Sequence, residues 1–420
     1  MTKLLILFCC LLSLGQLQRI ELANDVAFYL HDIFIVLWLL HALIFKNFWK
    51  KLSTFLKEKI SLKKSQQISK LTLFFLLWST IGLVINFILN GLQIKPFLYI
   101  LRIALYIFFG VNLHLNKNNL KLRIQNSTFS FIRLAFIYFG LATLYFGFLQ
   151  YILLPDTRFL KIAGWDDHYY RLISTQFDPN FTGIILVLTF LYWQSLTIFK
   201  NIKSKQSKFL KYSTDLLIIC GLLLTYSRAS YLAFIVAVML LVGKFLKQKK
   251  QGKEGELRPW VQIKKYLIYL ILFLSLIPFL PRPTGEGVKL ERTTSINARF
   301  STNERILKSL KPYQWIIGQG VFTKQIQKES PDSLNARLNI PDHAYLADNL
   351  IVMLIAYTGL IGTGIFFLIL WKWSRELIKK DFYIFTSLIA ILAHSMFNNT
   401  LLQAFVLLML IGGIVSINKE

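Results

Sequence analysis

Cysteines are scarce in this chain, and their placement excludes two classes of protein. Only 3 cysteines occur among 420 residues, and Cys9, Cys10 and Cys220 all lie within apolar stretches. Such thiols provide neither a disulfide framework nor the paired spacing of a zinc site, and are expected to behave as small buried hydrophobes. The H-E-x-x-H, paired CxxC, D-x-D and P-loop signatures are also absent from the sequence. We therefore expect no metal and no cofactor.

Acidic residues are few as well, 21 against 48 lysines and arginines, which leaves a formal net charge of +27. A basic surface can bind the phosphates of nucleic acids without specificity. Here the basic residues instead gather in short loops between apolar blocks, as in KNIKSKQSKFLK at 200–211. That distribution is typical of membrane proteins, in which it sets the orientation. We therefore expect membrane lipids as partners and no nucleic acid.

Long apolar blocks are abundant. The chain is 55% hydrophobic and 15% aromatic, with a mean hydropathy of +0.52. Blocks of about 17 to 24 apolar residues are long enough to cross a hydrocarbon layer as helices. The sequence predicts an all-α fold, a polytopic membrane helix bundle in which 1–420 form one integral membrane domain. We expect about twelve spans at 4–20, 26–45, 71–90, 96–115, 131–153, 181–199, 210–226, 229–247, 264–281, 347–371, 382–398 and 400–417. Residues 1–18 resemble a signal peptide, but no clear cleavage site follows them, which favours a first membrane helix.

The charge distribution predicts the orientation. About two thirds of the lysines and arginines fall in alternate loops and at the termini. The positive-inside rule then places both termini in the cytoplasm. Two segments on the outer side, 154–180 and 282–346, exceed ordinary loop length, and such loops are usually functional or disordered. The second is expected to be a large periplasmic loop that folds against the bundle.

Arg228 is the first candidate for function. The stretch TYSRASY at 225–231 interrupts an apolar run too long for one crossing, which predicts a tight reversal at Ser227-Arg228. Arginine near a bilayer interior is costly and therefore functional by default, although at the tip of a reversal it could simply reach the lipid headgroups. Ser227 and Ser230 could hold the guanidinium in a fixed direction.

Arg171 and Asn180 flank LISTQFDPN, just before the sixth predicted span. Asp178-Pro179-Asn180 alone indicates a turn followed by a helix start. A capped helix entry is the simpler interpretation of Asn180, and Arg171 is a surface residue unless it folds inward. Both are kept as candidates for substrate binding.

Arg299 and Arg305 lie in the long loop, downstream of Lys289 and Arg292. Charged groups outside the membrane are usually solvated. Basic residues nevertheless outnumber acidic ones about two to one in this loop, and arginine is suited to bidentate contacts with phosphate. An anionic partner is therefore expected.

His343 stands in PDHAYLADN, where the polar loop gives way to the tenth apolar block. Asp342 is expected to be an N-cap, with His343 as the first helical residue. The positive end of a helix dipole disfavours imidazolium, and a neutral imidazole can accept a proton as a general base does. In the alternative interpretation Asp342 caps the helix and His343 merely faces solvent.

Other polar residues near these blocks have simpler explanations. His394, in AHSMFNN, is expected to be buried and hydrogen-bonded, and His168 in WDDHYY is weak support for a metal site. Arg102, within the fourth span, could reach the membrane surface or pair with Asp215.

Four stretches together resemble the O-antigen ligase/polymerase family of bacterial envelope enzymes. They are RLISTQFDPNFTGIIL (171–186), LLLTYSRASYLAF (222–234), ARFSTNERILKSLKPYQWIIGQG (298–320) and DHAYLADNLIVMLIAYTGLIG (342–362). Their order and position within the predicted topology, over residues 171–362, carry the resemblance. The chain departs from the family pattern in having Ala344 after the histidine, and Glu304-Arg305 where a tryptophan is expected.

This resemblance implies a metal-independent, inverting glycosyltransferase in the bacterial inner membrane. The donor would be a glycan on undecaprenyl pyrophosphate, and the acceptor a hydroxyl of a lipid or glycan. Arg228 and Arg299, with Arg171, would bind pyrophosphate, supported by Ser227, Asn180 and Arg305. His343 would be the catalytic residue, as a base or in orienting the donor.

Two alternatives stay open at the level of sequence. A polymerase of lipid-linked repeat units, or a transferase onto protein hydroxyls, would use the same donor chemistry. A transporter of lipid-linked sugars would instead need charged residues in several spans and inverted repeats. Arg102 is the one firm midspan charge in the sequence, so this function is less favoured.

Overall fold

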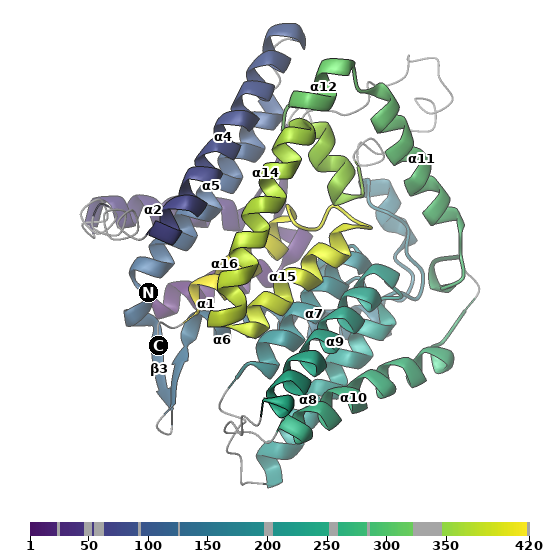
Figure 1. Cartoon of the computed structure of the whole chain (residues 1–420). Coiled ribbons are helices and arrows are strands. Elements are labelled where there is room, and N and C mark those ends of the chain that lie inside the picture. Colours follow the sequence, from purple (N-terminus) through teal and green to yellow (C-terminus); the bar gives the residue numbers. More distant parts are fainter. Residues whose placement is uncertain are drawn as a thin grey trace.

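The structure, a computed structural model, describes residues 1–22, 26–45, 53, 63–90, 94–124, 127–196, 205–251, 259–283, 286–321 and 347–417. Within these residues the chain is a bundle of α-helices (Figure 1), which confirms the predicted all-α membrane class. His343 and its neighbour Asp342 lie outside the described residues.

Each of the twelve predicted spans overlaps a helix. These helices are α1 (Thr2–Ser13), α2 (Leu30–Phe45), α4 (Lys63–Asn90), α5 (Ile94–Leu115), α6 (Phe131–Leu153), α7 (Pro179–Gln194), α8 (Lys205–Leu224), α9 (Arg228–Lys250), α10 (Pro259–Leu276), α14 (Leu350–Lys380), α15 (Phe382–Ser395) and α16 (Ala404–Val415). In the described part of the chain, six helices are long and apolar enough to cross a membrane, judged by length and composition alone. These are α4, α5, α6, α9, α10 and α14. Four others are shorter apolar helices. Twelve complete crossings stay a prediction.

Helix α7 lies at the centre of the bundle. Its sequence, PNFTGIILVLTFLYWQ, is apolar on nearly every face, and almost all of its side chains are buried. A helix that is hydrophobic all round belongs in the interior. It packs against α6, α8, α9 and α15, so residues at its first turn lie where several helices meet.

The prediction for span 4–20 is wrong beyond Ser13. Helix α1 ends at Ser13, and Gly15 adopts a φ of +53°, a value that few residues other than glycine tolerate. The chain then forms a short antiparallel hairpin of β1 (Arg19–Leu22) and β2 (Val26–Tyr29). A second hairpin, β3 (Lys121–Ile124) with β4 (Ser127–Ser130), replaces the predicted loop before α6. Strand pairing satisfies backbone groups that these short connections would otherwise leave open.

The proposed pairing of Arg102 with Asp215 is also wrong. Arg102 on α5 lies 3.1 Å from the carboxylate of Asp32 on α2, and donates to the carbonyl oxygen of Ala27 at 2.6 Å. Asp215 on α8 accepts hydrogen bonds from Gln194 and Tyr269. Helix α5 packs against α2 and α16, whereas α8 packs against α6, α7, α9 and α10, so these two charges belong to different parts of the bundle.

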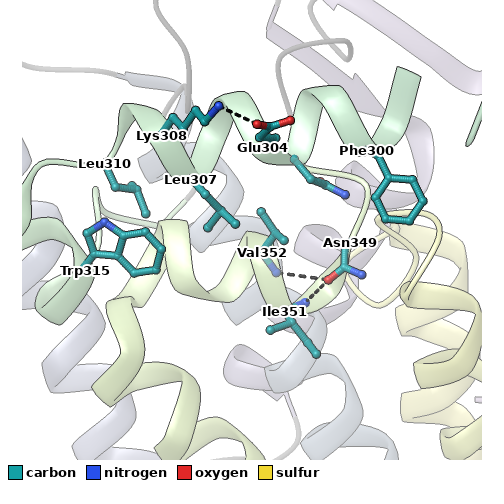
Figure 2. Close-up of a pocket in the computed structure, with 10 residues that line it drawn as sticks. Phe300, Glu304, Leu307, Lys308, Leu310, Trp315, Asn349, Ile351 and Val352 are labelled. Carbon is teal, nitrogen blue, oxygen red and sulfur yellow. Dashed lines mark hydrogen bonds and ion pairs between the residues drawn. The ribbon is translucent and has the colours of Figure 1, made fainter. Parts of the chain in front are cut away.

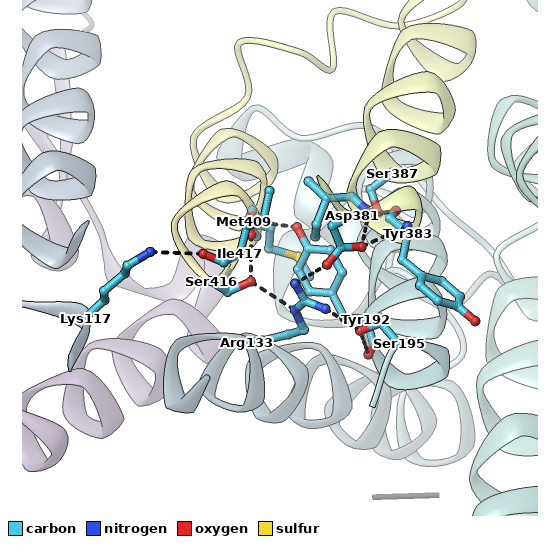
Figure 3. A network of polar contacts seen from close by, with 12 residues as sticks. Lys117, Arg133, Tyr192, Ser195, Asp381, Tyr383, Ser387, Met409, Ser416 and Ile417 are labelled. Carbon is cyan, nitrogen blue, oxygen red and sulfur yellow. Dashed lines mark hydrogen bonds and ion pairs between the residues drawn. The ribbon is translucent and has the colours of Figure 1, made fainter. Parts of the chain in front are cut away.

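A polar network joins four segments at the end of the bundle where α15 begins (Figure 3). Arg133 of α6 forms an ion pair with Asp381 at 2.6 Å, and donates to the hydroxyls of Ser416 and Ser195 at 2.9 Å each. Asp381 is itself the N-cap of α15. One guanidinium thereby connects α6 to the ends of α7 and α16 and to the start of α15.

At the opposite end, the segment of α11 (Thr294–Ser309) and α12 (Pro312–Ile317) lies over the bundle beside α14 (Figure 1). We call this the loop end, because α7, α9 and α14 also begin there. A break in α14 at Gly359 holds the segment in place: Gln319 N donates to Ala356 O at 2.7 Å and Gly320 N to Tyr357 O at 3.2 Å. The carbonyl groups freed by the break are therefore used to bind the loop.

Candidate functional site

The first turn of α7 forms one wall of the site. Asp178 is its N-cap and accepts hydrogen bonds from the backbone N–H groups of Asn180 and Phe181, while Pro179 occupies the first helical position. The predicted turn and capped helix start are therefore confirmed. The Asn180 side chain is not part of this cap. Its Oδ1 accepts a hydrogen bond from the Ser227 hydroxyl at 2.8 Å, which joins the start of α7 to the start of α9.

A buried chain of hydroxyl and imidazole groups continues from that contact, and we call it the His394 network. Ser230 Oγ lies 2.9 Å from Ser227 Oγ and 3.0 Å from Nε2 of His394. On the other side of the ring, Nδ1 lies 2.6 Å from Thr400 Oγ1. Both ring nitrogens of this fully buried histidine are thus engaged. The expectation that His394 is buried and hydrogen-bonded is confirmed, and its partners connect α9 to the end of α15.

Arg171 folds inward beneath the turn between α8 and α9. Only 6% of the residue is exposed, and its guanidinium donates to the carbonyl oxygens of Thr225, at 3.0 Å, and Tyr226, at 3.4 Å. Burial, reinforced by the positive charge of Arg292, lowers the pKa of Arg171 to about 9. The carboxylates of Asp178 and Asp166 offset only part of this cost, and an anion bound beside the guanidinium would offset more of it.

Arg228 is the first residue of α9, as predicted from the reversal, and Ser227 is its N-cap. Its guanidinium donates to the carbonyl oxygens of Leu290, at 3.2 Å, and Arg292, at 2.6 Å. The hydroxyls of Ser227 and Ser230 are instead engaged with Asn180 and His394, so the expectation that these serines orient the guanidinium is wrong.

Arg299 extends the cluster from α11. It donates to the side-chain oxygen of Asn398 at 2.9 Å and lies 3.4 Å from the carboxylate of Asp348. Its charge acts on both Arg228 and His394. Arg171, Arg228, Arg292 and Arg299 are therefore linked, each through a hydrogen bond or through the electrostatic field of the next, into what we call the arginine cluster.

The structure thus brings together five of the seven residues expected from the sequence: Arg171, Asn180, Ser227, Arg228 and Arg299. Arg305 is exposed on α11, and its guanidinium donates to Thr302 at 3.3 Å. His343 lies outside the described residues, as does Asp342, its expected cap. Within the described residues α14 begins at Leu350, where Asn349 is the N-cap.

Sequence reasoning did not select Arg292 or His394. Arg292 resembled any solvated charge in a long loop, and the signal available was its position between Arg228 and Arg299 in a basic segment. In the structure its guanidinium donates to the carbonyl oxygens of Gly287 and Lys289, which fixes it near Arg171. His394 resembled a packing residue, and spacing alone gave no indication that its partner would be Ser230.

A cavity of about 690 Å³ lies beside the arginine cluster, between α11 and the first turn of α14 (Figure 2). Its wall is mostly apolar, and includes the aromatic rings of Phe300 and Trp315. Asn303, Glu304 and Asn349 supply polar groups at its edge. Phe300 follows Arg299 directly in α11, so the cavity and the cluster share one helix. A mostly apolar cavity with a few polar groups suits a ligand that has both an apolar and a polar surface.

The site can therefore do two things chemically. Its guanidinium groups, held by backbone carbonyls and, for Arg299, by the side chains of Asn398 and Asp348, can bind a phosphate or pyrophosphate and stabilise negative charge that develops on it. The cavity, which borders the helix that carries Arg299, has room for a second molecule.

Comparison with known proteins adds one finding. Residues 214–367 match the protein-family model described as O-antigen ligase. The matched stretch runs from α8 into α14, and it contains Ser227, Arg228, Arg292 and Arg299. No curated protein and no solved structure was found to match the chain.

Proposed function

We propose that this chain, whose residues 214–367 match the O-antigen ligase family model, moves a glycan from undecaprenyl pyrophosphate to an acceptor hydroxyl. The transfer would need no metal and would invert the anomeric carbon. The observation that carries the proposal is the arginine cluster at the loop end. Its charges are fixed by carbonyl oxygens of Thr225, Tyr226, Leu290 and Arg292. A pyrophosphate would supply the negative charge that these groups lack.

In the proposed reaction the acceptor oxygen attacks the anomeric carbon of the donor sugar. The new carbon–oxygen bond forms as the bond between that carbon and the pyrophosphate oxygen breaks. The electron pair leaves with undecaprenyl pyrophosphate, and Arg171, Arg228 and Arg299 stabilise the added charge on its phosphate oxygens. Because the donor carries its own leaving group, the reaction needs no nucleotide.

His343 would take the proton of the acceptor hydroxyl or orient the donor. The described chain stops at Val321, directly after a contact of Gly320 with α14, and resumes at Ala347 beside Asp348, the partner of Arg299. Gly320 and Asp348, which precede and follow the segment that contains His343 in the sequence, therefore both lie at the loop end. This placement supports a role for His343 in the same site.

The cavity between α11 and α14 is our candidate for the acceptor. Phe300 and Trp315 offer rings for the apolar face of a sugar or for a lipid chain, and Asn303 and Asn349 lie close enough to the rim to bond hydroxyls. For this geometry to work in a cell envelope, the loop end faces the periplasm, the bundle lies in the inner membrane and both termini lie in the cytoplasm.

The test uses full-length protein in lipid nanodiscs with an undecaprenyl-pyrophosphate glycan and candidate acceptors. We expect Arg171→Gln, Arg228→Gln and Arg299→Gln each to lower kcat/KM by roughly 100-fold, since each removes a contact that strengthens as charge develops. His343→Ala should abolish transfer. Arg158→Gln is the matched control. Arg158 also lies in the segment that leads into α7, but it pairs with Asp156 at the surface and is not part of the arginine cluster.

Two outcomes decide the proposal. If the three arginine variants and His343→Ala fold normally and retain full activity, the proposed mechanism is wrong. If transfer occurs, the product separates the remaining alternatives: a lengthened donor indicates a polymerase, whereas glycan on a lipid acceptor indicates a ligase. Arg305→Gln measures whether that exposed residue also binds the donor, and a loss smaller than for Arg299→Gln is expected.

A further inference from the structure

Three side chains with metal-binding atoms meet at the loop end, outside the arginine cluster. They are Asp166 and His168, from the segment between α6 and α7, and Asp178, the N-cap of α7. One ligand atom from each lies within 4.8 Å of the other two. Among the residues that the structure describes, this is the one group in which three such potential metal ligands converge.

Backbone contacts fix this arrangement. Thr157 donates to the carbonyl oxygen of His168 through its backbone N–H, at 3.0 Å, and through its hydroxyl, at 2.9 Å. The rings of Trp165 and Phe177 pack edge to face with their centroids 5.6 Å apart. Since these aromatic residues directly precede Asp166 and Asp178, their contact brings the two carboxylates to the same place.

His168 gives an independent indication that a ligand belongs here. The residue is 7% exposed, and its Nε2 is buried with no hydrogen-bond partner among the described residues. Leaving a buried ring nitrogen without a hydrogen-bond partner is energetically costly, and such groups are rare in folded proteins unless a ligand or an ordered water bonds them. Asp178 uses Oδ1 to cap α7, which leaves Oδ2 for a ligand.

We infer that Asp166, His168 and Asp178 bind a divalent transition-metal ion such as Zn²⁺. One imidazole nitrogen and two carboxylate oxygens form a ligand set that zinc accepts, with water completing the coordination. Ligands about 2.0–2.1 Å from a tetrahedral ion stand roughly 3.4 Å apart. The three atoms, which lie within 4.8 Å of one another, must therefore approach by at most about 1.4 Å, and rotation of the exposed Asp166 side chain can supply part of this movement.

The charges around the group set the affinity and the role of the site. Arg171 and Arg292 act on His168, and they oppose a cation. We therefore expect this group to bind zinc with lower affinity than a closed structural zinc site does. The metal would connect the 154–178 segment to the first turn of α7, where Asn180 contacts Ser227. Its role is structural, so it is independent of the phosphate chemistry proposed above.

The test measures bound metal directly. Full-length protein, purified in detergent with a tag free of histidine, is stripped with EDTA, dialysed and titrated with Zn²⁺, and bound zinc is measured by mass spectrometry. We expect the wild type to bind about one zinc ion more per chain than His168→Gln or Asp166→Asn does. Asp167→Asn is the matched control, because it removes the same charge from the neighbouring position, and it should bind zinc as the wild type does.

Thermal unfolding provides the second measurement. Zinc should raise the melting temperature of the wild type and of Asp167→Asn, and leave that of Asp166→Asn unchanged. Asp166 is exposed, so its variant should fold even if His168→Gln does not. The inference is overturned if Asp166→Asn and Asp167→Asn bind zinc equally, or if the wild type binds none. Arg228→Gln should retain zinc, so a failure of the proposed transferase function stays distinguishable from a failure of this site.

Discussion

At the scale of single residues, the polar side chains of the site fall into two sets that differ in their hydrogen-bond partners. Arg171 and Arg228 donate to backbone carbonyls, which fixes their direction without neutralising their charge. Carbonyl oxygens carry only partial charge, so these hydrogen bonds by themselves do not neutralise the two guanidinium groups. The hydroxyls of Ser227 and Ser230 instead connect Asn180 to His394. One set of residues is therefore suited to binding, and the other to holding helices in register.

His394 is the residue whose removal should separate these two roles. His394→Ala deletes both ring contacts of the His394 network and leaves Ser230 and Thr400 without their partner. We expect a loss of stability of about 1–3 kcal/mol, read as a lower melting temperature, and a higher KM for the donor because Asn180 and Ser227 lose their fixed position. His394→Gln should restore part of both, since an amide can bond one of the two hydroxyls.

His41→Gln is the control for this prediction. His41 is exposed on α2, so its replacement should change neither quantity. An unchanged melting temperature and KM in His394→Ala would mean that the network does not position the start of α7.

At the scale of elements, two glycines determine how the loop meets the bundle. Gly318 (φ 80°, ψ 179°) follows α12, and Gly359 (φ 67°, ψ −178°) interrupts α14. Both conformations lie in a region that essentially only glycine occupies. Each glycine also lies against the backbone of the other segment: a Cβ on Gly359 would lie 2.0 Å from the carbonyl oxygen of Ile316, and one on Gly318 2.4 Å from the backbone of Tyr357.

Gly359→Ala should therefore separate α12 from α14. Strained backbone and the clash with Ile316 together are expected to cost more than about 3 kcal/mol, seen as a large drop in melting temperature. Gly364→Ala, five residues further along α14, is the matched control, because a Cβ there meets nothing within 4 Å. It should be neutral or slightly stabilising. Equal melting temperatures for the two variants would contradict this account of the break.

The helices could be predicted from the sequence, whereas the contacts between them could not. Long apolar blocks identify helices because burial and helical hydrogen bonding are both local requirements. The cap formed by Asp178 was predictable for the same reason. Which helices are neighbours depends on the whole bundle. The sequence therefore does not show that the partner of Arg102 is Asp32 and not Asp215. The inward turn of Arg171 and the contact of α12 with the break at Gly359 likewise depend on distant segments, and local spacing carries no signal for them.

At the scale of the whole molecule, the two ends of the bundle differ in the use of charge. The end at which α15 begins is closed by the network of Arg133, in which a carboxylate and two hydroxyls satisfy the guanidinium. At the loop end, arginines converge on backbone carbonyls beside a cavity. The first arrangement joins helices, and the second leaves positive charge available to a ligand. This asymmetry favours placing the chemistry at one face of the membrane.

The orientation of the bundle decides whether that face is the periplasmic one. The basic end of α9, with Lys247, Lys249 and Lys250 in its last turn, should stay in the cytoplasm under the positive-inside rule. In a variant with the three native cysteines replaced by serine, a cysteine at Gln251 should react with a membrane-impermeant maleimide only after permeabilisation of spheroplasts. A cysteine at Ile162, which is 93% exposed in the segment before α7, should react in intact spheroplasts.

The reverse labelling pattern would place the arginine cluster in the cytoplasm. The cluster would then face the compartment in which nucleotide-linked sugars are available. A lipid donor that carries its own pyrophosphate would have no advantage there over a nucleotide-linked donor. Labelling of both positions in intact spheroplasts would instead mean that α7, α8 and α9 do not cross the membrane as three successive spans, because residues 162 and 251 are separated by those three helices. The expected pattern therefore tests the number of crossings in this part of the chain together with the side on which the proposed transfer takes place.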